Sequence, residues 1–173
     1  MYNPLKAITS ALRRQRTSRG FGVHSPFAFG FIVSVLTCKY PYYCFDNLEA
    51  TARHLGEMKP KDALTLFRVI DQFVPSAIGI VGNESETVRQ VVNAWCDRCH
   101  VITSYEPDFI IITDDGTLPA DIGEKIIVML STRSSVWDGL KARMTRGMTF
   151  SNRRIGIAVN LTRLPRHDFI LNF

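Results

Sequence analysis

Three short apolar runs in the second half of the chain constrain the fold more than any other feature. They cover residues 77–81, 108–113 and 125–130, and turn-forming residues follow each of them. Continuous apolar runs of this length are typical of strands buried on both faces of a parallel sheet. Segments with helical periodicity, such as 60–74 and 135–144, alternate with these runs. The pattern predicts an α/β fold with a Rossmann-like, mostly parallel sheet.

The end of the chain predicts a different kind of pairing. Residues 149–160 are β-like, as one long strand or as a hairpin that turns near Asn152-Arg153, and residues 169–173 alternate as a terminal strand. No helical segment separates these strands, so we expect an antiparallel C-terminal edge. A weak strand at 100–103 lies only four residues before 108. Because parallel neighbours need a crossover of about a dozen residues, we expect this weak strand to lie outside the sheet.

The N-terminal third is predicted to be helical. Residues 1–60 are expected to form a helical cap and residues 61–173 a Rossmann-like domain, with helices over 4–16, 46–57 and 60–74. A further helix opens at Ser25-Pro26, where serine suits the N-cap and proline the first helical position. Phe27 to Leu36 is apolar on every face. This helix is therefore expected to be largely buried.

Charge is concentrated in the leader. The chain has 21 Lys and Arg against 16 Asp and Glu, and no acidic residue occurs before Asp46. The basic side chains of this segment are Lys6, Arg13, Arg14, Arg16, Arg19 and Lys39. No apolar run approaches the roughly 20 residues of a membrane helix, so no membrane partner is expected. The four cysteines, without a secretory signal, predict reduced thiols in a cytoplasmic protein.

Three stretches carry a family resemblance. Residues 20–27, Gly-Phe-Gly-Val-His-Ser-Pro-Phe, and residues 42–45, Tyr-Tyr-Cys-Phe, resemble the leader of a group of bacterial class I S-adenosylmethionine-dependent methyltransferases. The ending at 166–173 is similar to the terminal strand of that group. The resemblance implies a methyltransferase-type sheet behind a helical cap, with S-adenosylmethionine as the cofactor.

The cofactor motif departs from the family's pattern. The family has an acidic residue on the first strand before a glycine-rich turn, whereas Ile80 stands at that position here. Gly82 is kept, but Glu86 falls near a later glycine position, and Glu84 adds a second charge. These carboxylates suit a helix N-terminus but repel the methionine carboxylate of the cofactor. The segment that would contain the family's third strand and its helices is largely absent from this sequence. We therefore expect a shortened, degenerate member of the group.

Four residues are the candidate cofactor-binding site. The resemblance implies that Gly82 and Asn83 line the methionine end of the cofactor and that Asp114 or Asp115 lies beside the acceptor. Ligands of α/β sheets bind at such strand ends. Asp-Asp-Gly is also ordinary turn chemistry. Asn83 and Glu86 have the spacing of a capping box. No catalytic residue is identified and no metal is expected.

The cysteines predict neither haem nor zinc. Cys96 to His100 matches the C-x-x-C-H pattern of haem attachment. That chemistry needs export, for which the sequence shows no signal. The spacing of Cys38 and Cys44 is not the usual second pair of a zinc site.

Three functions remain open at this point. The favoured one is a non-catalytic, methyltransferase-like binding or interaction protein. The first alternative is an active small-molecule methyltransferase with a rearranged cofactor loop. The second is an RNA or phosphate binder that uses the basic leader, although the adjacent apolar helix favours packing over nucleic acid. A homodimer through that helix is also left open.

Overall fold

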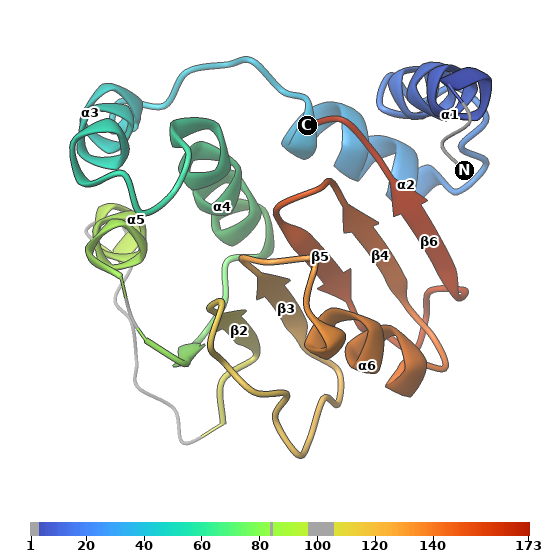
Figure 1. Ribbon diagram of the computed structural model, residues 1–173. Helices are drawn as coiled ribbons and strands as arrows, with labels where there is room; N and C mark the ends of the chain where they lie inside the picture. Colours follow the sequence, from blue (N-terminus) through green and yellow to red (C-terminus); the bar gives the residue numbers. More distant parts are fainter. Residues whose placement is uncertain (1–3, 84, 97–105) are drawn as a thin grey trace.

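The computed structural model describes residues 4–83, 85–96 and 106–173 (Figure 1). The helices are α1 (Pro4–Thr17), α2 (Pro26–Phe31), α3 (Phe45–Leu55), α4 (Pro60–Phe73), α5 (Glu86–Cys96) and α6 (Ser135–Arg143), and a π-helical turn, η1 (Ile32–Leu36), continues α2. The strands are β1 (Ile78–Val81), β2 (Phe109–Ile112), β3 (Ile126–Met129), β4 (Met148–Ser151), β5 (Gly156–Val159) and β6 (His167–Ile170). The weak strand predicted at 100–103 lies outside the described residues.

The strands form one sheet in the order β1-β2-β3-β5-β4-β6. Strands β1, β2 and β3 are parallel, β5 is antiparallel to both of its neighbours, and β6 is parallel to β4. The predicted α/β class and the mostly parallel sheet are confirmed. The antiparallel strand, β5, belongs to the C-terminal half but lies inside the sheet, between β3 and β4. It pairs with β4 in a hairpin that turns near Asn152-Arg153, which was one of the two alternatives for residues 149–160. The edge strand β6 is parallel to β4, whereas the sequence predicts an antiparallel edge.

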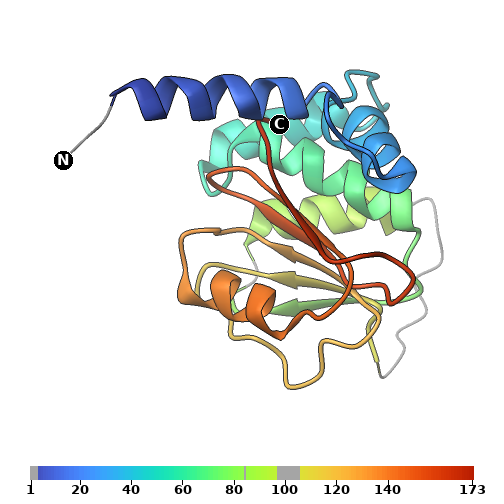
Figure 2. The same cartoon turned by 90° about the vertical axis from the view of Figure 1, so that its right-hand side faces the viewer.

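The alternation of side chains along each strand divides the core into two layers. Ile111 and Val128 face the cluster that contains α2, η1, α3, α4 and α5. Ile110 and Ile127, one residue earlier on the same strands, face α6 and its Trp137. Consecutive strand residues point to opposite faces, so apolar runs without alternation produce a sheet covered on both sides. Figure 2 shows the helical layer on one face and α6 on the other.

The leader packs on the same core as the sheet. Ser25 is the N-cap of α2, since its Oγ accepts a hydrogen bond from the Ala28 amide at 3.3 Å, and Pro26 occupies the first turn. Phe31 of this helix is buried against Phe150 of β4. However, Phe29 and Val33 are 48% and 40% exposed. The predicted burial therefore holds for the face with Ala28, Phe31, Ile32, Val35 and Leu36 and is wrong for the face with Phe29 and Val33.

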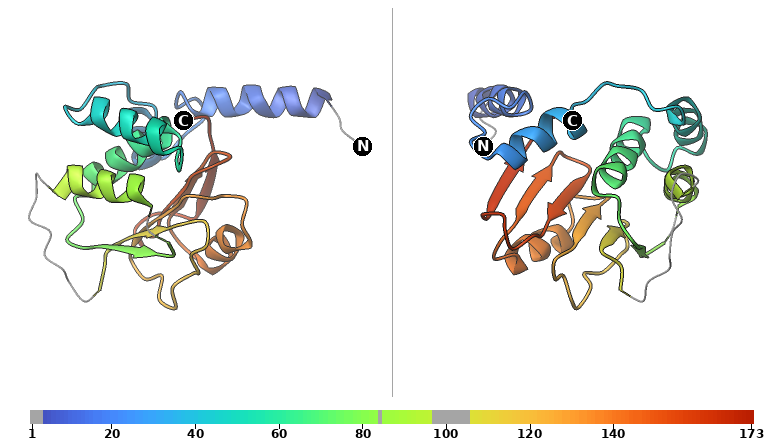
Figure 3. Two further views of the ribbon diagram at one scale, coloured as in Figure 1. Left: turned by 60° about the vertical axis from the view of Figure 1, so that its left-hand side comes forward. Right: turned by 180° about the vertical axis from the view of Figure 1, so that it is seen from behind.

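The terminal strand begins earlier than the sequence pattern predicts. It runs over His167–Ile170, and the Leu171 amide adds one more hydrogen bond to the Ser151 carbonyl at 2.8 Å. The next outward amide, that of Asn172, donates to Ser18 Oγ at 2.7 Å. This bond attaches the end of α1 to the edge of the sheet. The rest of α1 extends away from the helical layer (Figures 2 and 3).

An ion pair joins the helical layer to the β4–β5 hairpin. Asp62 in the first turn of α4 is buried, and its two carboxylate oxygens accept hydrogen bonds from Arg154 Nε at 2.5 Å and from a terminal Arg154 nitrogen at 2.8 Å. Asn152 holds the hairpin turn by accepting from the Arg154 and Ile155 amides. The pair therefore connects segments 92 residues apart.

The environment of Tyr42 indicates that the stability of the helical cap decreases at alkaline pH. Its ring lies against Phe45 and Phe67, and burial together with a hydrogen bond to Asp71 raises its pKa to about 12. An unfolded tyrosine titrates near pH 10, so the stabilisation is full below that pH and is lost as pH rises toward 12. Tyr42→Phe is expected to make the unfolding midpoint less sensitive to pH between 9 and 11.

The matched control for this measurement is Tyr40→Phe, which removes a hydroxyl from a side chain that is 81% exposed. The measurement is the thermal unfolding midpoint of the wild-type protein, Tyr42→Phe and Tyr40→Phe at pH 9 and at pH 11. If the unfolding midpoint falls by the same amount between pH 9 and 11 in the wild-type protein and in Tyr42→Phe, the prediction is contradicted.

Candidate functional site

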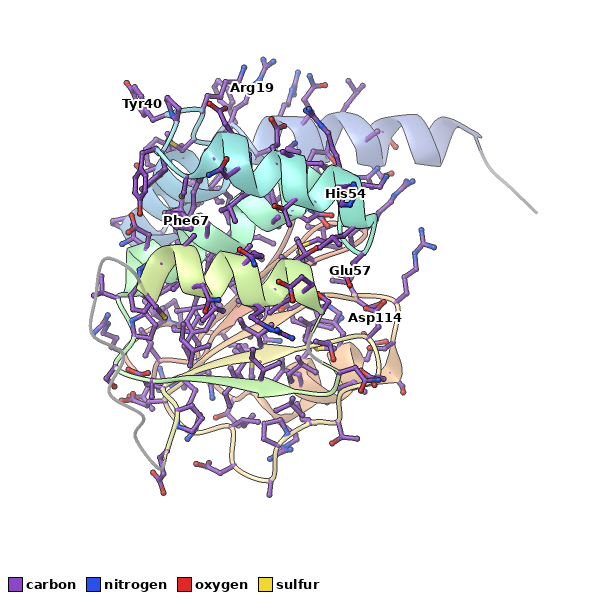
Figure 4. The ribbon with its side chains drawn as sticks, turned by 90° about the vertical axis from the view of Figure 1, so that its left-hand side faces the viewer. Arg19, Tyr40, His54, Glu57, Phe67 and Asp114 are labelled. Carbon is purple, nitrogen blue, oxygen red and sulfur yellow. The ribbon has the colours of Figure 1, made fainter. Side chains whose placement is uncertain are left out.

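The four residues predicted for the cofactor lie at the carboxyl ends of two adjacent strands. Gly82 and Asn83 follow β1, whereas Asp114 and Asp115 follow β2. Because β1 and β2 pair in register, the two turns meet at one edge of the sheet. Asn83 and Asp115 are in direct contact, since the Asn83 amide donates to Asp115 Oδ1 at 2.9 Å. Asp114 is exposed at the same end of the molecule (Figure 4).

Asp115 fixes the two turns to each other. The same Oδ1 also accepts a hydrogen bond from Thr113 Oγ1 at 2.8 Å, and the Thr113 amide donates to the Val81 carbonyl at 3.0 Å. The bond from the Asn83 amide, followed by that from Thr113, lowers the pKa of Asp115 below its ordinary value. This carboxylate is thus used within the protein, to hold the turn after β1 against the turn after β2.

The N-cap of α5 differs from the predicted capping box. Ser85 caps the helix, because its Oγ accepts from the Val88 amide at 3.2 Å and its carbonyl accepts from the Arg89 amide at 3.0 Å. Asn83 instead donates its backbone amide to Asp115. The predicted capping box is therefore wrong, because Ser85 provides the cap while the Asn83 amide donates to Asp115 in the turn after β2.

A carboxylate from a distant loop lies at the N-terminus of α5. Glu57 Oε2 accepts hydrogen bonds from the Thr87 amide at 2.9 Å and from Thr87 Oγ1 at 3.0 Å. Glu57 follows Gly56, whose left-handed backbone ends α3. Figure 4 shows Glu57 beside the first turn of α5, with Asp114 at the same end of the molecule. The Thr87 amide is the main cause that lowers the pKa of Glu57.

Sequence reasoning missed Glu57. Its partner is 30 residues away, and no local pattern around Gly56 distinguishes this glutamate from an exposed loop residue. The same reasoning did recognise the charge at the helix start. Glu86 is in the first turn of α5, and its carboxylate contacts Gln90 and Arg89 on the same helix.

The arrangement disfavours an anionic ligand at α5. A helix N-terminus ordinarily attracts anions because its first amides are unpaired and its dipole end is positive. Here the Thr87 amide is already bound to a carboxylate, and Glu86 adds a second carboxylate in the first turn. The carboxylate end of an amino-acid group would have to displace Glu57 and approach Glu86. These residues therefore do not fit the methionine carboxylate of S-adenosylmethionine.

Replacing Glu57 is expected to destabilise the protein near neutral pH. Glu57→Ala leaves the Thr87 amide and hydroxyl without their carboxylate partner, so the unfolding temperature falls. Glu57→Gln keeps a neutral hydrogen-bond acceptor, so its unfolding temperature should fall less. Because the folded-state pKa is lowered, the carboxylate's contribution is present above its ordinary pKa and is lost as pH falls through the folded value.

Thermal unfolding at pH 7 and pH 3 checks the Glu57 prediction. The difference in unfolding temperature between the wild-type protein and Glu57→Gln should be smaller at pH 3 than at pH 7. The control is Glu49→Ala, which removes a surface partner of Arg53. A Glu57→Ala midpoint no lower than that of the control would contradict the prediction.

Two surface cavities lie away from the four predicted residues. The larger, of about 880 Å³, is a groove between α1 and the edge strand β6. The smaller, of about 460 Å³, lies at the carboxyl ends of β3 and β4 beside Trp137 and Arg133. Neither is lined by Gly82, Asn83, Asp114 or Asp115.

Among the described residues, no group of three or more His, Cys, Asp or Glu side chains is placed to hold a metal ion. No helix of that part of the chain combines the length and apolarity that crossing a membrane requires. Cys96 ends α5, whereas Cys99 and His100 of the C-x-x-C-H pattern lie outside the described residues.

Comparison with known proteins finds no protein-family model, no curated protein and no solved structure that matches this chain.

Proposed function

We propose that this protein is a methyltransferase-like binding protein that does not use S-adenosylmethionine, because its own side chains occupy the region where the cofactor's amino-acid end would bind. The resemblance of the leader at 20–27 supports the methyltransferase relation. The mostly parallel sheet with one antiparallel strand in its C-terminal half is compatible with it. The function is then recognition rather than catalysis.

The observation that carries this proposal is the Glu57 carboxylate at the N-terminus of α5. It binds the Thr87 amide and hydroxyl, which an incoming anion would otherwise use. Asp115 in turn binds the Asn83 amide, so the turn after β1 is also committed. Moreover, β1 is the terminal strand of the described sheet, which agrees with a shortened relative.

The competing function is an active methyltransferase with a rearranged cofactor loop. It requires Glu57 to leave α5 when the cofactor binds. Under that mechanism, removing the carboxylate would strengthen cofactor binding, because the competing anion is lost. Under our proposal Glu57→Ala is expected to remain without measurable affinity, since Glu86 and the fixed turn after β1 still exclude the ligand.

Thermal shift with S-adenosylmethionine and S-adenosylhomocysteine at millimolar concentration tests the proposal. A ligand at 100 times its Kd stabilises the folded state by about 2.7 kcal/mol. For a chain of this size each kcal/mol raises the midpoint by about 2–4 °C, so binding would give a shift of roughly 5–10 °C. We expect no shift for the wild-type protein or Glu57→Ala. A shift of that size in either protein would contradict the proposal.

A further inference from the structure

The larger of the two surface cavities is the groove between α1 and β6. One wall is a face of α1 that includes Arg13 and Arg16, and the other is the outer edge of β6. Because β6 ends the sheet order, no strand of the described residues pairs with its outer side. Figure 1 shows α1 on the same side of the sheet as α2, beyond β6. The groove thus lies where a further strand would add to the sheet.

The backbone of β6 offers one edge for such pairing. The His167 and Leu171 amides donate to β4 and its flanking residue, at the Gly147 and Ser151 carbonyls. Since alternate residues of a strand direct their amides to opposite sides, the amides of Asp168 and Ile170 point away from β4. The hydrogen bond between Asn172 and Ser18 marks the end of this open edge. An exposed edge of this kind is a template for an added strand.

The two sides of the groove differ in the side chains that they would favour in a bound peptide. Arg13 and Arg16 supply positive charge from α1, in a leader that contains no acidic residue before Asp46. The single acid in the groove wall, Asp168, is paired with Arg166 at 2.6 Å. On the opposite face of the sheet from α1, Ile170 is 64% exposed. The α1 side of the groove therefore combines basic side chains with exposed Leu12 and Phe21, and the far face of β6 presents Ile170 beside the Arg166–Asp168 pair.

We propose that this groove binds an extended acidic peptide segment of a partner protein, which pairs with β6 as an added strand. Its side chains would alternate, because those of a strand point to opposite faces. Acidic residues would meet Arg13 and Arg16, and apolar residues between them would pack near Ile170. Backbone pairing with specificity from alternate side chains is a common way to recognise peptides. This inference deepens the proposed binding function by naming the partner's chemistry, and it rests on that function.

The test uses fluorescence anisotropy with a labelled heptapeptide of alternating glutamate and valine. The comparison probes are a peptide of the same composition with its glutamates and valines in two blocks, and an alternating lysine–valine peptide. We expect the alternating acidic peptide to bind at least tenfold more tightly than either. The double variant Arg13→Glu/Arg16→Glu should weaken its binding at least tenfold.

A proline variant separates strand pairing from simple charge attraction. Ile170→Pro removes the outward amide and leaves the bonds to β4, a position where an edge strand tolerates proline. It should weaken peptide binding at least tenfold, whereas Ile170→Val, which keeps the outward amide and most of the apolar side chain, should weaken it less than threefold. Thermal unfolding of both variants checks that the fold is kept.

Three results would overturn the inference. One is equal binding of the alternating and block peptides, or none at all. Another is loss of binding in the arginine variant but not in Ile170→Pro. The third is tighter binding of a labelled uridine dodecamer, with the steep salt dependence of phosphate contacts, which would assign the groove to nucleic acid. All three leave the cofactor titration unaffected, so failure here is distinguishable from failure of the proposed function.

Discussion

Arg154→Met is expected to lower the free energy of unfolding by about 2–3 kcal/mol, below the 3–5 kcal/mol typical of a fully buried pair. The reduction reflects the partial exposure of Arg154, whose side chain is 37% accessible against 7% for Asp62. Removing the arginine leaves the Asp62 carboxylate buried at the start of α4 without its bidentate partner. Urea unfolding measures the loss.

Two further variants make this prediction specific. Arg153→Met removes the neighbouring, exposed arginine and should change stability by less than about 0.5 kcal/mol. The double variant Asp62→Leu/Arg154→Met removes both charges and should recover most of the loss, because no unpaired charge remains buried. Equal stabilities of the Arg153 and Arg154 variants would show that the pair does not hold the helical layer to the hairpin.

Gly82→Ala is expected to cost about 3 kcal/mol, from backbone strain and overpacking together. Gly82 has φ +99°, and a Cβ there would overlap Thr113 Oγ1 and lie 2.7 Å from Asp115 Oδ1. The methyl group must therefore separate the turns that Asp115 holds together. Urea unfolding gives the stability, and amide exchange at Asn83 reports whether its bond to Asp115 is lost.

The matched control for Gly82 is Gly139→Ala in α6, where a Cβ meets nothing within 4 Å. Alanine at that helical position should stabilise by about 0.5–1 kcal/mol. If Gly82→Ala is as stable as the wild-type protein, the two turns are not packed as described, and the region has room for a ligand.

The sheet could be predicted from the sequence because the local apolar pattern of each central strand is typical of a buried strand. The runs at 108–113 and 125–130 contain only apolar residues at their centres, and they became β2 and β3. The hairpin at Asn152-Arg153 was predictable because Asn152 is a turn residue between β-like segments. The alternation at Phe169, Leu171 and Phe173 predicts a terminal strand that begins too late, because alternation reflects burial, and burial continues beyond the paired residues of β6.

The candidate site was predictable only in its location. Strand ends mark where Gly82 and Asp115 lie, but their use depends on contacts between distant segments. Glu57 reaches Thr87 across 30 residues, and no pattern of one helix or strand encodes that pairing. The groove between α1 and β6 likewise needs both ends of the chain, brought together by the bond from Asn172 to Ser18, 154 residues apart.

Calorimetric titration of the wild-type protein with S-adenosylhomocysteine tests the central claim most directly. The product is a suitable probe because it keeps the amino-acid end that Glu57 and Glu86 would oppose. The account predicts no heat of binding up to millimolar ligand. Saturable binding at micromolar strength would contradict it and would mean that Glu57 yields its place at α5 to the cofactor.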